Sequence, residues 1–167
     1  DLSRIYEGMY LSTLDKVKTK GQVVRMWRNE CMRVFADKLI NHSDRGIVVD
    51  EMLPNLVKTY FKDCQEEVMQ NPILFGDFKL VDPEDADGES NVLRLYEDLI
   101  DYPSVKTKMD TILEAYNFNN REMGLVLFDD ALEHITKIHR ILRFDKGSAL
   151  LVGFGGSGKQ SLTRLAT

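Results

Sequence analysis

The residue types with the clearest chemical potential form a glycine-rich run near the end of the chain. Gly153, Gly158 and Lys159 satisfy the spacing G-x-x-x-x-G-K of a phosphate-binding loop. Glycines let backbone amides turn towards phosphate oxygens, and the lysine reaches the terminal phosphates as a point charge. We expect ATP or ADP with Mg²⁺ as the ligand. The predicted binding residues are Gly153, Phe154, Gly155, Gly156, Ser157, Gly158, Lys159, Gln160 and Ser161.

One position departs from this pattern. Phosphate-binding loops of this kind carry Ser or Thr after the lysine, and the hydroxyl holds the magnesium ion. Here Gln160 follows the lysine, and Ser161 lies one residue further on, about 100° round a helix. Both are imperfect magnesium partners, so we expect nucleotide binding to survive better than hydrolysis. The alternative is a glycine-rich turn between a strand and a helix that binds no ligand.

Two histidines and two cysteines are the other candidates for metal or nucleophile chemistry. His134 and His139 are five residues apart, whereas metal pairs on one helix face are three or four apart. We therefore predict surface or half-buried histidines. Cys31 and Cys64 also lack metal-ligand spacing, which indicates free thiols, buried or half-buried, in a reducing compartment.

Residues 82–90 are acidic and rich in turn formers, which raises the question of a calcium site. With Gly88 at the glycine position of an EF-hand loop, the first and last ligand positions fall on Pro83 and Arg94. Neither residue can serve as such a ligand. A solvated loop is the prediction for this segment.

The periodicity of apolar residues predicts a mainly α chain whose elements position the loop. A short buried strand at 148–152 precedes the loop, and a helix at 158–166 follows it. Pro54 is expected to delay the start of the helix that contains it, and Pro103 to lie in the first turn of another. Residues 72–78 read as extended. The other expected helices cover residues 2–14, 24–39, 52–61, 103–116 and 129–142.

Composition limits the classes of partner. Hydrophobic residues make up 43% and charged residues 29% of the 167 residues, which suits a folded core. The formal net charge of -5 argues against a nucleic-acid binder. No apolar run is long enough to span a membrane, so we expect neither nucleic acid nor a membrane as partner. Both ends read as if cut from a longer polypeptide, with one strand that has no following sheet.

Residues 127–166, LFDDALEHITKIHRILRFDKGSALLVGFGGSGKQSLTRLA, resemble the opening of the fourth AAA+ module in axonemal dynein heavy chains. The glutamine after the lysine belongs to that resemblance, whereas Phe154 stands where valine is more familiar. DLSRIYEGM and VVRMWRNECMRVFADKLIN resemble the helical subdomain that closes the third module. The second-sensor arginine of such a subdomain would precede Asp1, and Arg4 is a weaker candidate for it.

The resemblance implies a fold and a division of the chain. Residues 1–104 would be the C-terminal helical lid of one AAA+ module. Residues 105–167 would hold connector helices and the first strand, phosphate-binding loop and helix of the next, α/β module. Residues 125–128 would border the adenine. The chain alone is not expected to hydrolyse ATP. It carries no pair of acidic residues after a second strand that could bind the metal ion and activate the attacking water.

The resemblance also implies the activity of the parent protein. It would be an ATP-driven motor that moves towards microtubule minus ends, in the cytoskeleton of a cilium or flagellum axoneme. The expected partners are the neighbouring AAA+ modules, microtubules, and dynein intermediate and light chains. Two alternatives remain open at this point: a fragment of another AAA+ or P-loop ATPase such as a remodeller, and a non-catalytic helical interaction module.

Overall fold

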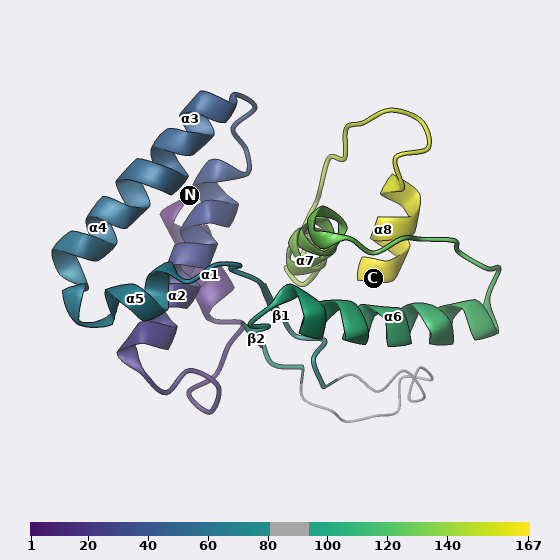
Figure 1. Ribbon diagram of the computed structural model, residues 1–167, viewed down its shortest axis with the longest axis horizontal. Coiled ribbons are helices and arrows are strands. Elements are labelled where there is room, and N and C mark those ends of the chain that lie inside the picture. Colours follow the sequence, from purple (N-terminus) through teal and green to yellow (C-terminus); the bar gives the residue numbers. More distant parts are fainter. Residues whose placement is uncertain (81–93) are drawn as a thin grey trace. The chain divides into compact units, whose positions relative to one another are not determined.

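The computed structural model describes residues 1–80 and 94–167, and is mainly α, as predicted (Figure 1). The predicted loop at 82–90 lies outside the described residues. The chain forms two compact units. The first comprises Asp1–Phe75 and Leu95–Asp98, and the second comprises Gly76–Arg94 and Leu99–Thr167. No helix in the described ranges is both long and apolar enough to cross a membrane.

The first unit is built from helices around an apolar centre. Its helical segments are α1 (Leu2–Met9), α2 (Lys20–Cys31), η1 (Met32–Ala36), α3 (His42–Gly46), η2 (Ile47–Met52), α4 (Leu53–Tyr60), η3 (Lys62–Cys64) and α5 (Gln65–Met69). Its main core cluster is Ile5, Met26, Cys31, Met32, Val34, Leu53, Ile73, Phe75 and Tyr96. The Thr19 hydroxyl and the Gln22 side chain form a reciprocal capping box that starts α2.

Two helix limits differ from those predicted. The first helix ends at Met9 rather than at residue 14, because the Leu11 carbonyl accepts a hydrogen bond from the Tyr96 amide at 3.3 Å. The chain is also helical on both sides of Pro54, from α3 to α4 (Figure 1). The π-helical η2 makes this possible, since the Leu53 amide bonds five residues back to the Val48 carbonyl.

Arginine side chains of α2 hold the segment that leads out of α5. The Arg25 guanidinium donates to the Gln70 carbonyl at 2.5 Å and to the Pro72 carbonyl at 2.7 Å. Arg28 donates to the Val68 carbonyl at 3.1 Å. Cationic donors at the C-terminal end of a helix satisfy its last carbonyls and complement its dipole. The path of the chain into residues 72–78 is thereby fixed.

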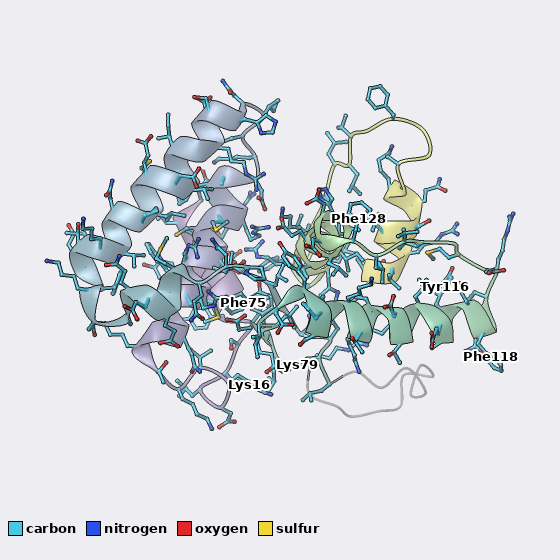
Figure 2. The ribbon with its side chains drawn as sticks, in the orientation of Figure 1. Lys16, Phe75, Lys79, Tyr116, Phe118 and Phe128 are labelled. Atoms are coloured by element: carbon cyan, nitrogen blue, oxygen red, sulfur yellow. The ribbon has the colours of Figure 1, made fainter. Side chains whose placement is uncertain are left out.

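Residues 72–78 are extended, as predicted, and contain β1 (Phe75–Gly76), which pairs with β2 (Glu97–Asp98). The rings of Phe75 and Tyr96 pack with centroids 5.6 Å apart. Lys16 forms an ion pair with Glu97 at 3.2 Å. Figure 2 labels Phe75 and Lys16 among the side chains of the first unit. Side-chain contacts between segments that are distant in the sequence thus support a sheet of only two short strands.

The second unit contains α6 (Tyr102–Asn119), α7 (Asp129–Leu142) and α8 (Lys159–Ala166). The Asp101 carboxylate caps α6 by accepting from the Ser104 amide at 2.8 Å, and Pro103 lies in its first turn as predicted. Helices α7 and α8 lie side by side (Figure 1). The buried apolar side chains of α7 and α8 are Ala131, Leu132, Ile135, Ile138, Leu162, Leu165 and Ala166.

The prediction of a buried strand at 148–152 is wrong for this structure. These residues form neither helix nor strand, and Leu150 is 91% and Val152 86% exposed. A strand of this apolar type is normally buried on both faces by neighbouring strands and helices. Within the described residues the strands are β1 and β2 alone, so nothing pairs with 148–152. The helix predicted at 158–166 is confirmed as α8.

The two free cysteines differ in environment, which leads to a prediction about their reactivity. Burial, with the nearby Glu30 charge, raises the pKa of the Cys31 thiol to about 12. Cys64 is only half-buried. Because the thiolate is the nucleophile, iodoacetamide at pH 8 should modify Cys64 first and Cys31 only on unfolding, as followed by peptide mass spectrometry. Equal alkylation of both thiols in the folded chain would contradict this assignment.

Candidate nucleotide-binding site

The glycine-rich loop has a backbone that requires glycine at two positions. Gly156 has φ of +78° and Gly158 has φ of +75°, both in the left-handed region that other residues rarely adopt. Gly158 is also the residue that caps the start of α8. The loop therefore turns sharply and delivers the chain directly into the first turn of a helix.

The Lys159 side chain folds across this loop. Its amine donates to the carbonyls of Gly153 and Phe154, both at 2.7 Å, and to the Ser157 hydroxyl at 3.0 Å. A Cβ at Gly153 would lie 3.2 Å from the Ser157 Oγ and 3.5 Å from the lysine nitrogen. The loop is therefore closed around the ammonium group, whose three donors all point at it.

The start of α8 adds unpaired donors beside this ammonium group. The first amides of a helix have no partner within the helix, and its dipole favours an anion at that end. In the described part of the chain, the backbone amides of Gly155, Gly156 and Gly158 donate no hydrogen bond. Residues 153–157 are also exposed to solvent. The free amides and the solvent access fit a phosphate group, which on binding would replace the loop carbonyls and hydroxyl as the partner of the Lys159 ammonium group.

The remaining predicted positions lie around the same turn. Gln160 is exposed and Ser161 half-buried in the first turn of α8, so their magnesium role stays a prediction. Leu125 lies beside the loop, since its Cδ1 is 3.8 Å from where a Cβ of Gly158 would be. Val126 and Phe128 are exposed in the segment that enters α7 (Figure 2 labels Phe128).

A buried polar group lies at the other end of α8. The His139 ring, on α7, is 7% exposed, and its Nδ1 is 2.8 Å from the Ala166 carbonyl. Its Nε2 contacts the Asp77 carboxylate, whose side chain is 2% exposed. The Arg143 Nε lies 2.5 Å from the other carboxylate oxygen of Asp77. The Phe78 ring packs edge-on to His139, with centroids 5.4 Å apart.

The charges in this cluster balance the cost of burial. Burial alone would raise the pKa of Asp77. The hydrogen bond from His139 and the charges of His139, Arg143 and Arg94 outweigh burial and hold that pKa below its ordinary value. Asp77 is therefore an ionised carboxylate whose stability depends on its partners.

Comparison with known proteins agrees with the loop and with the helical first unit. Residues 123–167 match the family described as P-loop containing dynein motor region D4, and residues 1–71 match the AAA+ lid domain. The chain is 53% identical over 166 residues to dynein axonemal heavy chain 10 of Homo sapiens. It is 49% identical over 168 residues to the dynein-1-alpha heavy chain, flagellar inner arm I1 complex, of Chlamydomonas reinhardtii.

The chain is homologous to a segment of axonemal dynein heavy chains. Each of these two alignments covers 99% of this chain but 4% of the relative. A third relative, the ciliary dynein beta chain of Tripneustes gratilla, is 36% identical over 170 residues, which is 100% of this chain and 4% of that protein. The resemblance predicted from the motifs is confirmed.

Sequence reasoning about this dynein homologue missed the buried cluster. His134 is exposed as predicted, but the prediction for His139 is wrong because that ring is buried. A signal was present: His139 follows Leu132 and Ile135 at the three- and four-residue spacing of the apolar face of α7. Asp77 could be suspected because it stands alone among apolar and aromatic neighbours.

The lowered pKa of Asp77 predicts a pH dependence of folding. A carboxyl whose pKa is lower in the folded chain contributes stability that is complete above its unfolded pKa, near 3.8, and is lost as pH falls through the folded pKa. Asp77→Asn should destabilise the chain by about 3 kcal/mol at pH 7, because a buried pair loses one charge.

The measurement is urea unfolding between pH 7 and pH 3. The gap in unfolding free energy between the native chain and Asp77→Asn should narrow as the pH falls. Other carboxylates contribute to both proteins, so the difference isolates Asp77. A gap that stays constant or widens towards pH 3 would contradict an ionised Asp77.

Proposed function

We propose that residues 153–161 bind the phosphates of ATP or ADP with Mg²⁺. The observation that carries this proposal is the Lys159 amine held over a loop whose Gly156 and Gly158 have left-handed backbones. Lys159 neutralises the terminal phosphates, and the amides of the loop and of the first turn of α8 cradle them. Gln160 and Ser161 face the magnesium ion that accompanies the nucleotide.

The adenine side of the site is formed by residues 125–128. Leu125 adjoins Gly158, and Val126 and Phe128 offer exposed apolar surface in the same segment. An apolar wall next to a phosphate-binding turn suits a heterocyclic base, which is flat and largely apolar on its faces. The chain holds and senses the nucleotide, and hydrolysis requires residues from elsewhere in the parent protein.

The parent protein is an ATP-driven dynein motor of the cilium or flagellum axoneme. The names of relatives at 53% and 49% identity, axonemal and flagellar, support this placement. Residues 1–104 close one AAA+ module of the motor ring, and residues 105–167 open the next. Neighbouring modules are the direct partners. Microtubules and the intermediate and light chains are partners of the parent, which moves towards microtubule minus ends.

A direct test compares nucleotide binding by the 167-residue chain and by Lys159→Ala. Calorimetric titration with ATP and ADP in Mg²⁺ should show a saturable site, and the substitution should weaken it about a hundredfold by removing a charge-assisted phosphate contact. Lys106→Ala, at an exposed lysine of α6, is the matched control and should bind as the native chain does. Equal affinities for the two lysine variants would contradict the proposal and favour a turn without ligand.

The glutamine after the lysine predicts a second, finer property. Gln160→Ser places a compact hydroxyl where related loops bind the metal ion. We expect Mg²⁺ to strengthen ATP binding several-fold more in Gln160→Ser than in the native chain. The measure is the ratio of the dissociation constants for ATP in EDTA and in Mg²⁺. Gln160→Ala should leave that ratio close to the native one. If Gln160→Ser has the same ratio as the native chain, this position does not face the metal ion.

A further inference from the structure

We propose that Asp77 and His139 are positioning residues for the phosphate-binding loop, acting through helix α8. The inference rests on the proposed nucleotide site and assigns a role to the segment after β1, whose chemistry the sequence alone leaves unexplained. Neither side chain touches the loop. Both lie at the opposite end of the helix whose first turn completes it.

The geometric path runs through one carbonyl. Helix α8 extends from Lys159 to Ala166, and the His139 Nδ1 lies 2.8 Å from the Ala166 carbonyl. Eight helical residues form a rod about 12 Å long, because each adds about 1.5 Å. A displacement of Ala166 along or around that axis therefore displaces Lys159 with it. Fixing one end of α8 fixes the loop at the other.

The hydrogen-bond inventory sets the role of each atom. The Ala166 carbonyl can only accept, so the His139 Nδ1 donates. The Nε2 faces the Asp77 carboxylate, which also accepts, so it donates too. Both ring nitrogens therefore face acceptors, with the Nδ1 directed at α8 and the Nε2 directed at Asp77. The other charged groups close to this carboxylate are Arg143 and Arg94. Asp77 thereby orients the ring that donates to α8.

Apolar packing also holds α8 against the rest of the second unit, through Leu162, Leu165 and Ala166. A purely structural role for His139 would lower stability without a preference between substitutions that remove the same ring. A positioning role makes a sharper demand. Under a positioning role, the hydrogen bond from the His139 Nδ1 to the Ala166 carbonyl must be kept. The contact of the Nε2 with Asp77 serves only to orient the ring for that hydrogen bond.

Two amide substitutions separate these roles. In His139→Asn the side-chain amide lies near the Nδ1 position and can still donate to Ala166. In His139→Gln the amide reaches the Nε2 position and can contact Asp77 only. We expect His139→Asn to keep Mg²⁺–ADP affinity within about threefold of the native value, and His139→Gln to lose about tenfold, as misplacement of a binding group does. Affinities are measured by calorimetry at a temperature where circular dichroism shows each variant folded.

Asp77→Asn is the third variant, with a control of the same chemistry in the first unit. Asp98 pairs with the Arg25 Nε at 2.5 Å, so Asp98→Asn also breaks an ion pair of a partly buried carboxylate. Asp77→Asn should weaken Mg²⁺–ADP binding about tenfold, because the imidazole ring, unlike the shorter amide of His139→Asn, needs the Asp77 carboxylate to turn its Nδ1 towards Ala166. Asp98→Asn should lower stability and leave affinity unchanged. If both aspartate variants, or both His139 variants, change affinity equally, the positioning role is overturned.

Lys159→Ala separates failure of this inference from failure of the nucleotide site. If Lys159→Ala binds as the native chain does, the nucleotide site itself is wrong and the positioning role falls with it. If Lys159→Ala loses binding while Asp77→Asn and His139→Gln retain it, the site stands and the positioning role is wrong. Loss in all three, with His139→Asn retained, supports both.

Discussion

The contact between the Asp77 carboxylate and the His139 ring is the interaction on which the second unit depends. A carboxylate this deeply buried costs several kcal/mol to desolvate, so it persists only when charged and hydrogen-bonding partners surround it. His139 lies on α7 and Arg143 directly follows that helix, and His139 in turn donates to the end of α8. Three separate stretches of sequence are therefore held in one arrangement by a single polar cluster inside an apolar core.

The glycine-rich loop depends on this arrangement in a different way. Its own residues are exposed and make few contacts with the rest of the unit, so packing does not shape it. Its form comes from two left-handed glycines, from the Lys159 amine that bridges its carbonyls, and from the helix on which it stands. The local sequence sets the curvature of the loop. The buried face of α8 sets where the loop lies.

Short-range sequence patterns predicted the features that depend only on neighbouring residues. The apolar period of α7, the proline in the first turn of α6 and the glycine spacing before α8 all correspond to observed features. Features that depend on distant residues were missed. Residues 148–152 have strand composition but no partner strand, and the first helix ends early because Tyr96 takes up the Leu11 carbonyl. The burial of His139 depends on Asp77, which lies 62 positions away.

Hydrogen exchange in α8 tests the central claim most directly. Amide exchange of residues 162–166 would be followed by mass spectrometry in the native chain and in Asp77→Asn, with α2 as the internal reference. If the Asp77–His139 contact holds α8 in place, these amides exchange faster in Asp77→Asn while those of α2 keep their protection. Equal exchange of α8 in the two proteins would show that apolar packing alone holds this helix, and the account given for the cluster would be wrong.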